Sequence, residues 1–459
     1  MMLLSEIAKA LNTTVIGEDI NVLSVGTDSR NIKAGQLFVA LKGEHFDGNA
    51  YAADAIARGA AAAVVSDADV EASPAVLVGD TKVALGELAH YWRQKFSIPV
   101  VAVTGSNGKT TVKEMLVSIL NVVSGEVLAT KGNFNNGIGM PLTLLNMRAE
   151  HEYAVIEMGM NHEGEIRYLT NIAQPQVAVI NNAGTAHIGE LGSREAIAQA
   201  KGEIFEGLSD GGVAVINADD DFGPYWQSLN VERKVITFGL EATGLSATAD
   251  VSATVETQAT HTAVKLKMPS GTVAFSLNVL GKHNVSNALA ASAVAVALGI
   301  NNEAIAAGLA QFNGVQGRLQ QHVGYQDAVV IDDTYNANPD SMKAAIDVLI
   351  NQYDASHTIF VMGDMAELGD DAGAMHAAIG QYAGQQGVSK LLSFGQLSQL
   401  GSNAFGTQGQ HFQTLETLVD AVKKEMHART CVLVKGSRSM KMERIVEAIV
   451  KDKKRGSTH

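Results

Sequence analysis

A glycine-rich loop between a strand-like run and a helical run carries the clearest chemical signal of the sequence. The β-branched run Val100–Val103 enters the loop, and the helical stretch Val112–Leu120 follows it. Glycines let backbone N–H groups turn toward phosphate oxygens, and the helix N-terminus adds about 0.3–1 kcal/mol. Lys109 and a Mg²⁺ ion on the Thr110 hydroxyl must then carry most of the charge neutralisation of a triphosphate. The predicted phosphate-binding residues are Thr104, Gly105, Ser106, Asn107, Gly108, Lys109, Thr110 and Thr111.

The loop departs from the usual phosphate-loop pattern at one position. That pattern has a glycine six residues before the lysine, where this chain has Val103. The loop is therefore a shortened variant, which disfavours generic kinases and motor proteins. The alternative is a glycine-rich turn with a surface lysine, and the order strand, loop, helix disfavours it.

Two further strand-like runs end in side chains that suit a cation. Tyr153–Ile156 is followed by Glu157, and Val177–Ile180 is followed by a loop that reaches His187. Ligands of parallel sheets bind at the carboxyl ends of strands, so both ends face the phosphate loop if the strands are neighbours. Hard cations prefer oxygen, which makes Glu157 the better Mg²⁺ ligand. His187 is either a ligand of a second ion or, as for most lone loop histidines, a hydrogen-bonding residue.

The elements that must position these side chains follow an α/β pattern. Strand-like runs alternate with helical stretches after residue 98, as in a parallel sheet covered on both faces. Residues 246–280 instead alternate Thr, Ser and Val, which predicts an antiparallel addition. A second α/β pattern starts near residue 315. We therefore predict three domains, at 1–97, 98–314 and 315–459.

Composition and charge exclude several classes of protein. The chain has 459 residues, of which 46% are apolar and 18% charged, and a formal net charge of −14, which favours a globular protein over a binder of nucleic acid or anionic membranes. The apolar stretch Ser286–Ile300 is too short to span a bilayer, so we expect no membrane insertion. A single cysteine, Cys431, and an N-terminus that reads as an amphipathic helix indicate a reducing, cytoplasmic location.

Taken together, these segments resemble the Mur ligase family, the ATP-dependent amide-forming ligases of peptidoglycan precursor synthesis. The resemblance covers nearly the whole chain and is carried by residues 104–111, 157–160, 183–188, 200–205, 283–287, 317–318, 332–341 and 435–438. Residues 27–30, 131–141, 336–339 and 362–369 are most similar to the member that adds D-alanyl-D-alanine to UDP-N-acetylmuramoyl-tripeptide. The resemblance implies a small α/β domain for the UDP-substrate, a central P-loop ATPase domain and a C-terminal Rossmann-like domain that binds the dipeptide.

The resemblance also implies roles that spacing alone does not give. From its place in the helical stretch 192–205, Lys201 looks like a surface lysine. In the family the matching lysine is carbamylated. The resemblance therefore implies that a carbamylated Lys201 holds two magnesium ions together with Thr110, Glu157 and His187. The catalytic residues implied are Lys109, Glu157, His187 and Lys201. Four further nucleotide contacts are implied, at Asn284, Asn287, Arg318 and Asp333. Two alternatives stay open, a helix cap formed by Asn284 or Ser286 and an interdomain salt bridge at Arg318.

Substrate contacts are implied in all three predicted domains. The UDP-muramoyl site would involve Ser29, Arg30, Gly43, Asp47 and Gly48; the peptide and dipeptide sites would involve Asn133, Asn135, Asn136, Tyr335 and Asn336. The chain departs from its relatives at Gly137, where a polar side chain is common. We leave Gly137 out of the site.

The implied reaction forms an acyl phosphate from ATP and a carboxylate, which an amine then captures. A monomer with a large closure about residues 98 and 313 would bring the three substrates together. Three alternatives remain at this point: a relative that adds another amino acid, a phosphotransferase, and a nucleotide-binding regulator without turnover.

Overall fold

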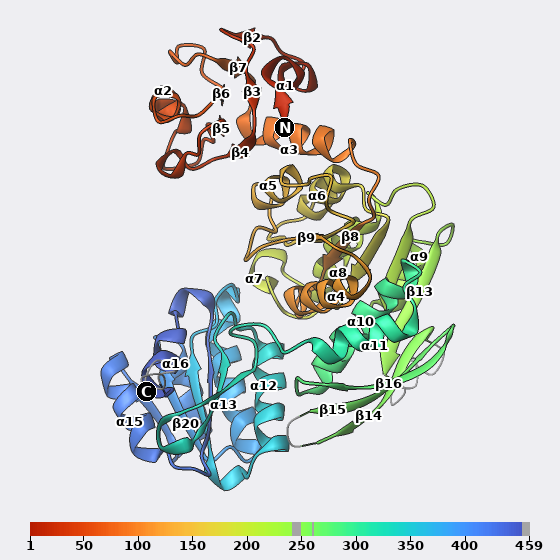
Figure 1. Ribbon diagram of the computed structural model, residues 1–459. Coiled ribbons are helices and arrows are strands. Elements are labelled where there is room, and N and C mark those ends of the chain that lie inside the picture. Colours follow the sequence, from red (N-terminus) through yellow and green to blue (C-terminus); the bar gives the residue numbers. More distant parts are fainter. Residues whose placement is uncertain (241–248, 259–260, 452–459) are drawn as a thin grey trace, which may run out of the picture.

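The computed structural model describes residues 1–240, 249–258 and 261–451 (Figure 1). Three α/β segments follow one another along the chain, each with its own main sheet, and the middle segment lies between the other two. Within the described ranges, no helix is both long and apolar enough to cross a membrane.

The first segment is a small sheet with helices packed around it. Its five-stranded sheet has the order β2-β7-β6-β5-β4, and β1 pairs with β3 in a separate ladder. The strands are β1 Met2–Leu3, β2 Val15–Ile16, β3 Asn21–Val22, β4 Ser24–Gly26, β5 Gln36–Val39, β6 Ala62–Val65 and β7 Ala75–Leu77. The helices are α1 Leu4–Ala10, α2 Ala52–Ala57 and α3 Thr81–Arg93. Asp80 caps α3, which packs against α5 and α6 of the middle segment and thereby joins the two segments.

The middle segment is built on a nine-stranded sheet of order β16-β15-β14-β13-β12-β11-β8-β10-β9. The strand β8 Val100–Thr104 lies between β10 Tyr153–Glu157 and β11 Val177–Ile180 and is parallel to both. The strands are therefore neighbours, as required for Glu157 and the loop after β11 to face the phosphate loop. Successive residues of β8 pack into the hydrophobic cores on opposite faces of the sheet. Val100 and Ala102 belong to one core, and Val101 and Val103 belong to the other. Helices α5, α6 and α8 cover the first face, and α4, α10 and α11 cover the second.

The other elements of this segment complete both layers. The remaining parallel strands are β9 Val127–Ala129, β12 Val213–Asn217 and β13 Lys234–Leu240. The helices are α4 Lys109–Val123, α5 Gly139–Leu145, α6 Glu165–Ala173, α7 Ile188–Leu191, α8 Arg194–Gly202, α9 Gly223–Ser228, α10 Lys282–Ala297 and α11 Asn302–Gln311.

The predicted antiparallel addition is present. The strand β15 Thr262–Met268 is antiparallel to both of its neighbours, β14 Val251–Thr257 and β16 Gly271–Leu277, and β14 joins β13 in parallel. In β15, Val264 and Leu266 are buried while Lys265 and Lys267 are exposed, the alternation of a sheet with one covered face. Parts of the predicted stretch, at 246–248 and 259–260, lie outside the described residues.

The C-terminal segment has a six-stranded sheet of order β17-β18-β22-β19-β20-β21, in which only β17 is antiparallel to its neighbour. Its last strand, β22 Cys431–Lys435, lies inside the sheet between β18 and β19, and burial raises the pKa of the Cys431 thiol. The other strands are β17 Gln320–Val323, β18 Val329–Asp333, β19 Thr358–Gly363, β20 Lys390–Phe394 and β21 Gly409–Phe412. The helices are α12 Pro339–Gln352, α13 Ala372–Gln385, α14 Ser398–Phe405, α15 Leu415–Glu425 and α16 Glu443–Ile449.

Candidate functional site

The phosphate loop is held in shape by the end of the neighbouring strand β11. Asn181 Nδ2 donates to the backbone oxygen of Asn107 at 2.9 Å, and Asn182 Oδ1 accepts from the Asn107 N–H at 2.8 Å. Lys109, the first residue of α4, curls back so that its Nζ donates to the Gly105 backbone oxygen at 2.7 Å. The loop therefore has a preformed turn with its lysine folded over it, ready to exchange a backbone oxygen for a phosphate oxygen.

Gly108 turns the loop into α4 and leaves no room for a side chain. Its φ is +79°, and a Cβ atom there would lie 2.2 Å from Asn287 Oδ1 and 2.4 Å from Asn181 Nδ2. We expect Gly108→Ala to raise the KM for ATP at least about tenfold, because the displaced loop loses its phosphate geometry. Gly211→Ala is the matched control: its φ is +73°, but nothing lies within 4 Å of the added atom. A KM for ATP that changes equally in both variants would contradict this reading.

Glu157 is a buried carboxylate beside the loop. Its Oε2 accepts from Thr110 Oγ1 at 3.0 Å and its Oε1 from Asn135 Nδ2 at 2.8 Å. The Glu157 N–H donates to Thr130 Oγ1 at 2.9 Å, and the buried Lys113 holds the Thr130 backbone oxygen at 2.7 Å. A carboxylate and a hydroxyl thus meet at the carboxyl end of the sheet, and oxygen donors of this kind suit Mg²⁺.

Lys201 is buried, which corrects the expectation from spacing of a surface lysine. It lies on α8 four residues after Ile197, and both side chains are on the covered face of that helix. Burial, and to a lesser degree the charge of Lys109, lowers the pKa of Lys201 well below its usual value. None of the ion pairs formed by the described residues includes Lys201. Since an unpaired buried ammonium is costly, the neutral amine is favoured.

His187 contacts the C-terminal segment. Its Nδ1 lies 2.8 Å from Glu367 Oε2, and the adjacent imidazole lowers the pKa of Glu367. Across the described ranges, no group of three or more His, Cys, Asp or Glu side chains is placed to hold a metal ion. The predicted metal-binding set also includes a threonine and a lysine: it consists of Thr110, Glu157, His187 and Lys201. Its binding of metal stays a prediction.

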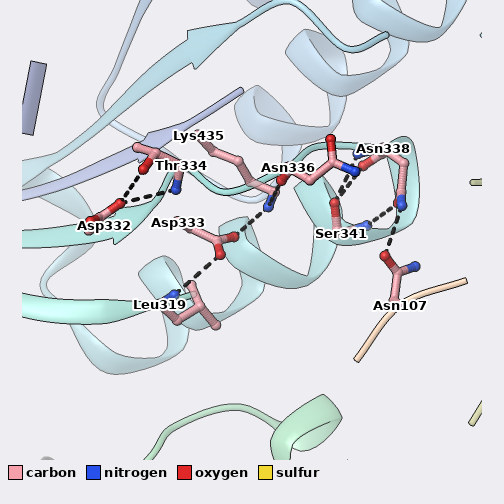
Figure 2. Close-up of polar contacts among 9 residues, drawn as sticks. All are labelled: Asn107, Leu319, Asp332, Asp333, Thr334, Asn336, Asn338, Ser341 and Lys435. Carbon is pink, nitrogen blue, oxygen red and sulfur yellow. Dashed lines mark hydrogen bonds and ion pairs between the residues drawn. The ribbon is translucent and has the colours of Figure 1, made fainter. Parts of the chain in front are cut away.

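Arg318 reaches from the C-terminal segment to the phosphate loop. Its Nη2 donates to Thr110 Oγ1 at 3.1 Å, and its guanidinium lies 4.4 Å over the Tyr335 ring. Of the two alternatives left open, the geometry brings Arg318 to the loop by a hydrogen bond, and no described carboxylate forms a salt bridge with it. Asp333, which accepts from Lys435 Nζ at 2.5 Å, lies on the same wall (Figure 2).

The start of α12 also docks on the phosphate loop. Asn338 caps this helix through a reciprocal pair of hydrogen bonds with Ser341, and its Nδ2 donates to Asn107 Oδ1 at 2.8 Å (Figure 2). Two residues further, in the first turn of the helix, Asp340 Oδ2 accepts from the N–H and the hydroxyl of Thr185, at 2.7 and 2.8 Å. The loop before His187 and the phosphate loop are therefore both attached to the C-terminal segment.

A cavity of about 940 Å³ lies where the segments meet, and it is lined by residues of all three. The predicted site residues on its wall are Ser106, Asn107, Gly108, Lys109, Thr111, Asn133, Asn135, Asn136, Glu157, His187, Asn284, Asn287, Arg318, Asp333, Tyr335 and Asn336. Thr104, Thr110 and Lys201 are buried. Asn284 donates to the Leu280 backbone oxygen just before α10 and accepts from Asn287, so it does not form the side-chain cap left open earlier.

The residues predicted in the first segment lie outside this cavity. Arg30 is 84% exposed and pairs with Asp28 at 2.8 Å, in the short helix that includes Ser29. Asp47 accepts from the Asn49 N–H, and a side chain at Gly48 would strike the backbone of Leu41. A side chain at Gly43 would strike the Phe46 ring. Their roles toward a ligand stay predictions.

Lys82 was missed by the sequence reasoning. It stands in the first turn of α3 and is the residue of the first segment that lines the cavity. Its Cε lies 3.2 Å from where a Cβ of Gly137 would be, so the small residue at 137 leaves space for this lysine. A cation two positions after the cap of a helix gave no signal in the sequence, because the cavity forms only when segments meet.

Comparisons with known proteins agree with this geometry. Three family models match the chain: the Mur ligase middle domain at residues 103–295, the Mur ligase glutamate ligase domain at 317–438, and the catalytic domain of the Mur ligase family at 21–93. The UDP-N-acetylmuramoyl-tripeptide--D-alanyl-D-alanine ligase of Escherichia coli (strain K12) is 43% identical over 97% of this chain and 98% of the relative. The chain belongs to the Mur ligase family.

Solved structures of Mur ligases share the arrangement of the segments. A crystal structure of MurF from Acinetobacter baumannii has a TM-score of 0.89 at 37% identity and covers 96% of this Mur ligase and 97% of that chain. MurF ligase from Thermotoga maritima in complex with ADP has a TM-score of 0.83 at 28% identity. The match covers 93% of this chain and 96% of that chain. The predicted family and three-part α/β fold class are thereby confirmed, while the boundaries 97/98 and 314/315 stay predictions.

Proposed function

We propose that this Mur ligase uses ATP to join D-alanyl-D-alanine to UDP-N-acetylmuramoyl-tripeptide, the substrates that the name of its Escherichia coli relative gives for that enzyme. The observation that carries the proposal is the cavity, in which a phosphate loop with a half-buried lysine faces both other segments. A Thermotoga maritima relative that was solved with ADP supports a nucleotide at this loop.

In the first step, the terminal carboxylate of the tripeptide attacks the γ-phosphorus of ATP. A new P–O bond forms, the bond to ADP breaks, and an acyl phosphate results. Lys109 leaves the Gly105 oxygen and donates to phosphate oxygens, and Arg318 approaches the same oxygens from the C-terminal wall. Both cations offset the repulsion between the anionic reactants, and fixed charges of this kind supply much of the catalysis in such reactions.

In the second step, the free amine of D-alanyl-D-alanine attacks the acyl carbon. The C–N bond forms, the C–O bond to phosphate breaks, and the amine's proton is taken up by the departing phosphate. No bond to the protein is required, so the chain's task is to hold and orient the two reactants and to exclude water.

We further propose that Thr110, Glu157, His187 and a carbamylated Lys201 hold two Mg²⁺ ions. The oxygen donors at Glu157 and Thr110 fit this cation, and the depressed pKa of Lys201 favours the neutral amine that reacts with CO₂. When bound, Mg²⁺ neutralises charge on the transferring phosphoryl group.

We propose the remaining residue roles as the resemblance implies them. Asn284, Asn287 and Asp333 would bind the nucleoside of ATP, and Asn133, Asn135, Asn136, Tyr335 and Asn336 the peptide substrates; their place on one cavity supports this. Ser29, Arg30, Gly43, Asp47 and Gly48 would bind the UDP-muramoyl moiety. We also propose a cytoplasmic monomer without nucleic-acid or membrane partners, which the net charge of −14 and the single free cysteine support.

The direct test is product analysis. Pure protein, ATP, Mg²⁺, UDP-N-acetylmuramoyl-tripeptide and D-alanyl-D-alanine should form the pentapeptide nucleotide, identified by mass spectrometry, with one phosphate released per product. A panel of amines separates this ligase from relatives that add another amino acid. Phosphate transfer to a stable acceptor without any amine would favour a phosphotransferase, and no turnover at all would favour a regulator.

Docking of the C-terminal segment should depend on Asp340. Asp340→Ala removes two charge-assisted hydrogen bonds to Thr185, each contributing about 1.5–3 kcal/mol. We expect the protein to open, with a larger radius of gyration by small-angle X-ray scattering and at least about a tenfold lower kcat/KM. Asp420→Ala, an exposed carboxylate on α15, is the control. If ATP and UDP-substrate change the scattering of neither wild type nor variant, closure about residues 98 and 313 is wrong.

A further inference from the structure

The cations on the C-terminal wall of the cavity differ in what already holds them. Arg318 donates to Thr110 at 3.1 Å and so faces the phosphate loop. Lys435 has a side chain only 3% exposed, and its Nζ donates to Asp333 at 2.5 Å and to the Asn336 backbone oxygen at 2.9 Å (Figure 2). Lys435 therefore has buried partners that it would lose by turning to another ligand, and Arg318 is already directed at the phosphate loop.

Arg438 is the third cation on this wall, and it stays accessible. It begins a short helix directly after β22, at the carboxyl end of the parallel strands, where ligands of such sheets bind. Its side chain is 62% exposed, and among the described residues it forms one ion pair, to Glu443 Oε1 at 3.1 Å. Because exposed pairs contribute only about 0–1 kcal/mol, Arg438 can turn to an incoming anion at little cost.

We propose that Arg438 binds the carboxylate of the incoming dipeptide, an inference that rests on the function proposed above. The dipeptide must be held by a group that does not react, and its carboxylate fits the planar fork of a guanidinium. A local cation is needed because the chain as a whole carries a net charge of −14 and repels anions.

The size of the dipeptide agrees with this assignment. Two extended residues span at most about 7 Å, so a carboxylate held at the C-terminal wall leaves the amine inside the same cavity. Of the Arg and Lys side chains that the described part of the C-terminal segment places on that wall, Arg318 faces the ATP phosphates and Lys435 stabilises Asp333. Different cations would therefore bind the dipeptide and activate the acid: Arg438 binds the dipeptide carboxylate, and Arg318 acts at the ATP phosphates.

The test measures each KM separately in the full-length enzyme. In Arg438→Met, we expect the KM for D-alanyl-D-alanine to rise at least tenfold, equivalent to about 1.4 kcal/mol, while the KM values for ATP and the UDP-substrate change less than twofold. The KM of Arg438→Lys for D-alanyl-D-alanine should lie between those of wild type and Arg438→Met. Arg429→Met, which removes an exposed arginine outside the cavity, is the control. Melting temperatures confirm folding of each variant.

A second arm uses D-alanyl-D-alanine amide, which lacks the carboxylate. If Arg438 binds the carboxylate, kcat/KM of wild type should be at least tenfold lower for the amide than for the dipeptide. In Arg438→Met, kcat/KM should be the same for the amide and the dipeptide. A variant that discriminates between acid and amide as wild type does, or one that raises the KM for ATP or UDP-substrate instead, overturns the assignment of Arg438. Wild type that forms no product with the dipeptide overturns the proposed function itself, so the two failures are distinguishable.

Discussion

Lys109→Met should lower kcat at least about a hundredfold, because removing a single preorganised donor from an active site costs about 10²–10³ in kcat. Burial lowers the pKa of Lys109, and the attraction of Glu157 opposes this effect. The side chain contacts the Gly105 oxygen and has no described carboxylate in hydrogen-bond contact, so phosphate is the partner that its position serves. Methionine keeps the length and the apolar stem while removing the charge.

The measurement is single-turnover formation of ADP at saturating ATP and UDP-substrate. Single turnover isolates phosphoryl transfer from the later capture by the amine. Lys9→Met, on an exposed position of α1, should leave the rate unchanged. A Lys109→Met enzyme with the wild-type rate would refute the assignment of the phosphate loop, and with it the proposed function.

Much of this site was predictable because its signals are local. Strand, glycine turn and helix around Lys109 are contiguous in the sequence, and Glu157 directly follows an apolar strand that the structure places beside β8. Parallel strands buried on both faces are written as continuous apolar runs, which is why the inner strands were found.

Edge strands were missed for the opposite reason. Strands β17 (Gln320–Val323) and β21 (Gly409–Phe412) lie at the two edges of the C-terminal sheet and are mostly polar. One side of an edge strand has no neighbour, so its pairing rests on backbone hydrogen bonds that leave no apolar pattern. The strand β9 (Val127–Ala129), at an edge of the central sheet, is only three residues long.

Contacts between segments were also beyond reach of the sequence. Asp340 and Thr185 are 155 residues apart, and neither belongs to a periodic pattern that predicts their meeting. The case of Lys201 is different. Its position four residues after Ile197 indicates a shared helix face, so a strict use of the helical period would have predicted its burial.

If Lys201 is carbamylated as proposed, the activity should depend on CO₂. The neutral amine adds CO₂ and releases a proton, which gives an anionic carbamate with oxygen donors. Since burial depresses the pKa of Lys201, the reactive neutral form persists to lower pH than for an exposed lysine. We expect removal of dissolved CO₂ to lower kcat at least about tenfold and bicarbonate to restore it, because one charged donor is worth this much or more.

Lys201→Met should lower kcat at least about a hundredfold and abolish the response to bicarbonate, since it keeps the stem and cannot form a carbamate. In wild type, acidification through the depressed pKa protonates the amine, so the carbamate and the activity should fall together as pH decreases. A ¹³C carbamate signal in protein equilibrated with ¹³CO₂, absent in Lys201→Met and present in the exposed-lysine control Lys234→Met, links the two effects. Full activity of Lys201→Met would contradict the carbamate, and because the phosphate loop is intact in that variant, it would leave the assignment of Lys109 standing.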